Sequence, residues 1–146
     1  MMFKIFVFFL LLSNQVFAKD LIIKDQGAVV FDLNDTKGKV VIVNFWVSWC
    51  VNCKKEMEIL TDLYNKYHSL GLEVIGFSID EKRNRDDFLK VKKDLKYPNF
   101  MLEDAVKNDF GWPNMIPKSY LIDRKGNVVL LEDIEDVEGK IRGIIF

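Results

Sequence analysis

The most regular feature of the chain is a pair of apolar segments with a helical segment between them. Residues 40–47 and 73–80 are apolar on both faces, which is typical of central strands in a covered sheet. From Cys50 to about His68 the chain has helical spacing, and the sequence "SLGL" ends it. The pattern therefore predicts strand, helix, strand in the middle of the fold.

The flanking segments predict further short elements. In chain order they are two strands around a turn at Gly27, an amphipathic helix over 81–96 that Pro98 ends, a strand over 99–104, a short helix over 105–110, strands over 118–123 and 128–133, and a C-terminal helix. A strand–helix–strand unit followed by a terminal hairpin and helix predicts an α/β fold. Its mixed sheet would be covered on both faces.

Composition changes this picture only by excluding some functions. At 146 residues, with 49% hydrophobic and 29% charged residues, the chain is typical of one soluble globular domain. Its formal net charge is −1, so it has no excess of Lys and Arg with which to neutralise phosphates. We therefore expect no nucleic-acid partner.

The first 18 residues have the layout of a secretory signal peptide. A single Lys4 precedes an apolar run over 5–12, and Val16 and Ala18 are small residues at the −3 and −1 positions of a cleavage site. The run is shorter than the about 20 apolar residues that span a bilayer. We expect a signal peptide over 1–18 and a domain over 19–146. An uncleaved membrane anchor is the alternative. Either places the domain outside the cytoplasm, where disulfides persist.

The chain has only two cysteines, Cys50 and Cys53, and three interpretations compete for them. A structural disulfide would close a two-residue loop, which constrains the unfolded chain very little. A structural zinc site needs four ligands, and His68 is the only histidine available. A redox dithiol needs sulfurs that can meet and one sulfur that ionises.

The helix that begins at Cys50 meets the needs of a dithiol. Cys50 and Cys53 lie on one face of its first turn. Free backbone N–H groups and the positive end of the helix dipole stabilise negative charge there. A strand that leads directly into this helix places the pair at the carboxyl end of the sheet, where ligands approach. Strand, Cys-x-x-Cys and helix in an α/β context therefore indicate redox chemistry.

The segments "VIVNFWVSWCVNCKKEMEIL" and "FGWPNMIPKSYLIDRKGNVV" carry a family resemblance. The chain resembles the exported TlpA/ResA-type thiol–disulfide oxidoreductases of the thioredoxin superfamily along nearly all of the mature domain. The resemblance implies a thioredoxin fold with an N-terminal β-hairpin and an inserted strand–helix element, in which helices cover both faces of a mixed central sheet. The region that begins "EKRNRDDF" fits the insertion.

The same resemblance assigns roles to site residues. Cys50 would be the exposed nucleophile, and the more buried Cys53 would resolve the mixed disulfide. Pro117 would be a cis-proline packed against the dithiol, and Ile116 would offer backbone groups to the substrate chain. Trp49 would form part of the substrate-facing surface. No cofactor is expected beyond the redox-active disulfide itself.

Glu56 occupies a slot that apolar residues otherwise fill. On the helix it lies in one stripe with Cys53 and Leu60, where partial desolvation would raise its carboxyl pKa. One turn from Cys53, it could exchange protons with that thiol. The family carries a glutamate here that is credited with tuning the cysteines. A side chain that reaches solvent, or that complements the helix N-terminus, is the alternative.

The function that follows is a periplasmic reductant of exported protein disulfides. The resemblance implies electrons from an inner-membrane thiol transporter and clients such as apocytochrome c before haem attachment. Asn52 stands where the family generally has proline, and the residues between the cysteines help set the reduction potential. A disulfide donor or isomerase therefore stays open. A Sco-type copper chaperone is a third hypothesis, although no histidine lies between Leu102 and Ile122.

Overall fold

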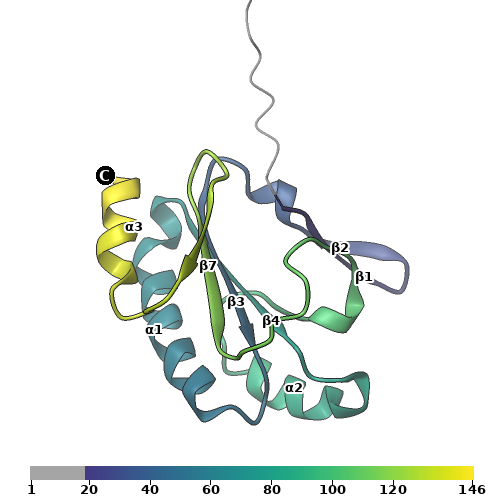
Figure 1. Cartoon of the computed structure of the whole chain (residues 1–146). Helices are drawn as coiled ribbons and strands as arrows, with labels where there is room; N and C mark the ends of the chain where they lie inside the picture. The colour runs from purple at the N-terminus through teal and green to yellow at the C-terminus, as the bar shows by residue number, and fades with distance from the viewer. Residues whose placement is uncertain (1–18) are drawn as a thin grey trace, which may run out of the picture.

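The computed structural model of the chain describes residues 19–146, and its centre is a five-stranded mixed sheet (Figure 1). The strands lie in the order β5-β4-β3-β7-β8, with the bounds β3 (Val40–Trp46), β4 (Leu72–Ser78), β5 (Asn99–Met101), β7 (Lys118–Ile122) and β8 (Val128–Leu131). β3 pairs in parallel with β4, and β4 with β5, whereas β7 is antiparallel to both β3 and β8. The expected signal segment, residues 1–18, lies outside the described residues.

β3 is buried along its whole length because both faces of the sheet are covered. Successive side chains of a strand point to opposite faces, and the two core clusters follow this alternation. Val40 and Ile42 belong to one cluster, and Val41 and Val43 belong to the other. The apolar run in the sequence thus reflects burial of both faces of this strand, as we expected.

Three α-helices pack on the first face of this sheet: α1 (Val51–Tyr67), α2 (Arg85–Lys92) and α3 (Val137–Ile145). Leu60 and Leu63 of α1 and Ile141 of α3 share one cluster. Figure 1 shows these two helices side by side, and Tyr67 donates a hydrogen bond of 2.6 Å to Glu138 between them. Phe88 of α2 stacks on the ring of Trp46 at 5.8 Å. Among residues 19–146, no helix has both the length and the apolar character to cross a membrane.

The second face is covered by a small sheet, not by an α-helix. Its strands lie in the order β2-β1-β6, with the bounds β1 (Leu21–Asp25), β2 (Ala28–Asp32) and β6 (Ala105–Asn108). Two single 3-10 turns, η1 (Leu33–Thr36) and η4 (Leu102–Asp104), add buried leucines. The expected α/β class and N-terminal hairpin are confirmed. The expectation that α-helices cover both faces is wrong for the described chain, because this three-stranded sheet takes the second face.

The expected helix over 105–110 is also wrong, because residues 105–108 form β6. Asn108 and Lys107 pair with Leu21 and Ile22 of β1, so β6 satisfies backbone groups that would otherwise form a free edge. A six-residue segment has little intrinsic preference for helix, and long-range pairing decides its state. This signal is not local, and the sequence pattern could not show it.

The amphipathic helix over 81–96 is shorter than expected. Residues 82–84 form a 3-10 turn, η3 (Lys82–Asn84), and α2 ends at Lys92. Asp94 N–H bonds to the carbonyl of Val91 at 3.2 Å, and Leu95 N–H bonds to that of Lys92 at 3.0 Å. These tighter turns end the helix and let Tyr97 enter the core before β5. The region expected to hold the inserted element therefore consists of α2 followed by β5.

The end of α1 agrees with the sequence pattern. A 3-10 turn, η2 (His68–Leu70), follows the helix, and Gly71 takes a left-handed conformation with φ of 103°. Glycine adopts this conformation without a steric penalty. Gly71 then leads directly into β4, so the strand–helix–strand unit at the centre of the fold is confirmed.

Candidate active site

The two cysteines form a disulfide at the N-terminus of α1. Their Cα atoms are 5.2 Å apart, within the usual range for a disulfide. Cys50 is the N-cap of the helix, and its Sγ accepts a hydrogen bond of 3.1 Å from the backbone N–H of Cys53. The sulfur of Cys50 thus lies where free N–H groups and the helix dipole favour negative charge.

The two sulfurs differ in their access to solvent. Cys50 has 9% of its surface exposed and Cys53 has 1%. Both pack in a cluster with Trp46 and Met57. Cys50 is therefore the cysteine that a partner can reach, although most of its surface is covered.

The loop that carries Cys50 is fixed by a buried carboxylate that the sequence analysis did not select. Asp80 Oδ1 accepts a hydrogen bond of 2.7 Å from Ser48 Oγ, and Asp80 Oδ2 accepts one of 2.9 Å from Ser48 N–H. Ser78 Oγ donates to Oδ2 at 2.5 Å. The sequence signal that could have identified Asp80 is an acidic residue at the end of an apolar strand segment, 73–80.

Glu56 lies half-buried against the sheet, as the apolar stripe predicted. Asn44 Nδ2 donates a long hydrogen bond of 3.4 Å to Glu56 Oε2 and a shorter one of 2.9 Å to Ser119 Oγ. Burial raises the pKa of the Glu56 carboxyl, the hydrogen bond with Ser119 opposes this, and the charge of Asp133 adds to it. Asn44 and Ser119 thus form a polar contact for a carboxyl that is otherwise poorly solvated.

Replacing Glu56 with glutamine should stabilise the fold near neutral pH and change it little in acid. A carboxyl whose folded pKa is raised costs stability as the pH climbs through its unfolded value, and the cost saturates above the folded pKa. Glutamine keeps the shape and removes the charge. Thermal melts of the reduced proteins at pH 4 and pH 8 measure the difference. If the Glu56→Gln protein melts at the same temperature as the wild type at pH 8 as well as at pH 4, burial of Glu56 carries no energetic penalty.

The structure places Trp49 and Ile116 near the disulfide and gives Pro117 the expected cis bond. Trp49 is 76% exposed beside Cys50, which agrees with a surface position. The peptide bond between Ile116 and Pro117 is cis, as expected. Ile116 packs against the cluster that contains both cysteines. Trp46 is fully buried, and its Nε1 donates a hydrogen bond of 2.9 Å to Asn99.

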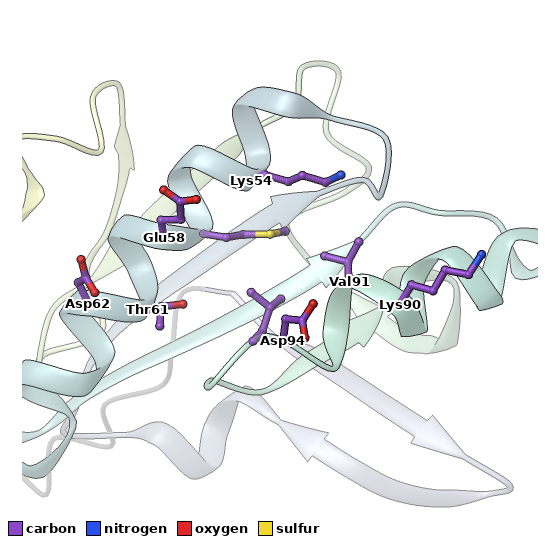
Figure 2. Close-up of a pocket in the computed structure, with 9 residues that line it drawn as sticks. Lys54, Glu58, Thr61, Asp62, Lys90, Val91 and Asp94 are labelled. Atoms are coloured by element: carbon purple, nitrogen blue, oxygen red, sulfur yellow. The ribbon is translucent and has the colours of Figure 1, made fainter.

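An open groove begins beside Trp49 and runs between α1 and α2 (Figure 2). Its main part has a volume of about 630 Å³ and shares Lys54, Lys90 and Val91 with a depression of about 330 Å³ that includes Trp49. Figure 2 shows Lys54 and Lys90 toward one end and Glu58 further along α1. Ser48 and Trp49, which precede Cys50 in the chain, line the depression, whereas neither cysteine lines the depression or the groove.

The described residues also bear on metal binding. Within residues 19–146, no three side chains of His, Cys, Asp or Glu come together in a group that could hold a metal ion.

A mixed sheet of this order, with a Cys-x-x-Cys disulfide at the N-terminus of the following helix and a cis-proline in the loop before β7, defines a thioredoxin-like dithiol protein. The comparison with protein families agrees with this class. The chain belongs to the AhpC/TSA family, whose model matches residues 15–131.

Curated relatives confirm the resemblance to the ResA type. The chain is 35% identical over 114 residues to the thiol-disulfide oxidoreductase ResA of Bacillus cereus, which covers 77% of this chain and 65% of that protein. It is 28% identical over 112 residues to ResA of Bacillus subtilis, which covers 77% of this chain and 63% of that protein. The chain thus spans slightly less than two thirds of these relatives' length.

Solved structures show the same fold. A thiol:disulfide interchange protein DsbE from Chlorobium tepidum superposes with a TM-score of 0.70 at 24% identity, over 87% of this chain and 94% of that chain. The thioredoxin domain of a thiol-disulfide oxidoreductase from Bacteroides vulgatus superposes with a TM-score of 0.64 at 26% identity, over 86% and 95%. The thioredoxin-like fold is therefore confirmed along most of the chain.

Proposed function

We propose that the protein is a thiol–disulfide oxidoreductase that reduces disulfides in exported proteins. The observation that carries the proposal is the Cys50–Cys53 disulfide at the N-terminus of α1, with Cys50 the more exposed of the two. The ResA relatives, which are named thiol-disulfide oxidoreductases, support the same reaction. The disulfide form is the oxidised product of the cycle.

The reaction begins from the reduced protein. The thiolate of Cys50 attacks one sulfur of a client disulfide, so that bond breaks, a mixed disulfide forms, and the released client thiolate takes up a proton. The thiolate of Cys53 then attacks the Cys50 sulfur and expels the second client thiol. Two electrons have passed to the client, and the Cys50–Cys53 disulfide remains.

The surroundings of the dithiol suit these steps. The N-terminus of α1 stabilises the thiolate of Cys50. Glu56, with its raised pKa, is proposed to exchange a proton with Cys53, since the two residues lie one turn apart on the same helix. Trp49 and the backbone of Ile116 before the cis-Pro117 are proposed to contact the client chain.

The proposed clients are polypeptides, because Trp49 beside Cys50 is exposed and lines an open depression that adjoins the groove between α1 and α2. By family resemblance, the client class is exported proteins such as apocytochrome c, and an inner-membrane thiol transporter returns the oxidised protein to the dithiol. The proposed location is the periplasm. The membrane would be a partner only if residues 1–18 stayed attached.

Export can be tested directly. After cell fractionation, mass analysis should find the protein outside the cytoplasm with Lys19 as its first residue. Backbone N–H of Asp20 already bonds to Asp109 at 2.8 Å, so cleavage after Ala18 would leave the described contacts in place. A full-length membrane-bound product would support the anchor alternative, and a full-length cytoplasmic product would contradict export.

The reduction potential of the Cys50–Cys53 couple tests the direction of electron flow. A reductant should lie near or below the about −270 mV of thioredoxin, whereas a strong oxidant lies near about −120 mV. For this two-electron couple the gap corresponds to about 7 kcal/mol. Equilibration with glutathione buffers measures the value. A potential above about −180 mV would contradict the reductant and favour a disulfide donor or isomerase, the alternative that Asn52 between the cysteines keeps open.

A further inference from the structure

Asp80 is a buried carboxylate that the proposed reaction does not use. Only 2% of its surface is exposed, and its carboxyl oxygens accept hydrogen bonds from neutral groups, namely the N–H and Oγ of Ser48 and the Oγ of Ser78. Burial of an unpaired charge is costly unless hydrogen bonds compensate for it. Its compensation comes from the two serines Ser48 and Ser78.

The bonds of Asp80 link two parallel strands just beyond their paired ends. Trp46 and Ser78 are the last partners of β3 and β4, and the N–H of Ile79 still bonds to the carbonyl of Trp46 at 2.8 Å. Beyond this point the chain after β3 has no strand partner. Asp80 holds it there through two polar groups of Ser48, its N–H and its Oγ.

Ser48 lies two residues before Cys50, in the turn that delivers the sulfur to the helix end. Within this turn, the N–H of Cys50 bonds to the carbonyl of Val47 at 3.1 Å. In the oxidised protein the disulfide adds a covalent tie between this turn and α1. Reduction removes the covalent tie, so the bonds from Ser48 to Asp80 then carry a larger share of the restraint.

We propose that Asp80 is a positioning residue that holds the Ser48–Cys50 turn in place when the dithiol is reduced. The inference rests on the proposed oxidoreductase function and extends it to a residue that touches neither sulfur in the network above. Its consequence is specific to the redox state. Weakening the bonds between Asp80 and Ser48 should disfavour the reduced form more than the oxidised form, because the disulfide still restrains the turn in the oxidised form.

The test is the thiol–disulfide equilibrium of the full domain with glutathione, in which two glutathione thiols reduce the protein disulfide and become one glutathione disulfide. Asp80→Asn keeps the shape but replaces one acceptor oxygen with an NH₂ group and removes the charge. We expect the equilibrium to shift roughly tenfold toward the protein disulfide, which corresponds to a potential lower by about 30 mV. Ser48→Ala, which removes only one donor, should shift it in the same direction by less.

Ser78→Ala is the matched control, because it removes from the strand side one hydrogen bond to the same carboxylate and the acceptor of the Asp80 N–H, and it leaves both Ser48 groups in place. It should lower the melting temperatures of both redox forms together and leave the equilibrium within a factor of two. If Asp80→Asn and Ser48→Ala also leave the equilibrium unchanged, or shift it toward the dithiol, Asp80 does not act as proposed. A wild-type protein that fails to exchange with glutathione would instead refute the oxidoreductase function, and this inference with it.

Discussion

A Cys53→Ser variant should accumulate as mixed disulfides with its clients, joined through Cys50. The reason is that the first attack needs only the more exposed Cys50, whereas release of the client needs the thiolate of Cys53. Cys50→Ser should trap few clients or none and should lose disulfide reduction. Non-reducing electrophoresis of extracts, followed by mass spectrometry of the trapped bands, measures both results.

The comparison also has an internal control, because both variants lose the disulfide and keep one thiol. A difference between them therefore reports position and not the loss of a covalent bond. Equal trapping by the two variants would mean that the exposed fractions of 9% and 1% do not decide which sulfur attacks.

The substitution Gly76→Ala should destabilise the fold by about 3 kcal/mol. A Cβ at Gly76 would overlap the side chain of Asn99. Asn99 is buried, accepts a hydrogen bond from Trp46 Nε1 at 2.9 Å and donates one to the carbonyl of Tyr97 at 2.9 Å. Moving Asn99 would break both bonds beneath the redox site. Thermal melts should show a decrease of roughly 10 °C.

Gly139→Ala is a suitable control for this prediction. Gly139 lies in α3, and a Cβ there would meet no atom within 4 Å. Alanine favours helix over glycine by about 0.5 to 1 kcal/mol, so this variant should be slightly more stable than the wild type. A Gly76→Ala protein with the melting temperature of the wild type would show that Asn99 can move without losing its hydrogen-bond partners.

The centre of the fold was predictable because its signals are local. An apolar run interrupted only by Asn44 predicted β3, and the cysteine spacing together with helical periodicity predicted the start of α1. The position of Glu56 in an apolar stripe gave its partial burial and the direction of its pKa shift. The contact with Asn44 and Ser119 was not predictable, because β7 reaches β3 only through the sheet register.

The small sheet that covers the second face shows more clearly what could not be predicted from the sequence. Residues 105–108 are a strand only because β1 offers them an edge that lies more than eighty positions earlier in the chain. The role of Asp80 likewise depends on the parallel register of β3 and β4, which brings residue 80 next to residue 48. In both cases the residue is visible in the sequence, but its contact partner becomes known only from the pairing of the strands.

The sulfur of Cys50 serves as the cap of α1, and this joins helix stability to electron transfer. A thiolate accepts a hydrogen bond more strongly than a neutral sulfur does, so reduction replaces the covalent tie of the disulfide with a stronger hydrogen bond at the first turn of α1. Serine is a good capping residue and would satisfy the same N–H. A serine at position 50 would therefore preserve the helix and abolish the redox reaction. Helix capping alone would favour serine at this position, whereas the reaction requires cysteine.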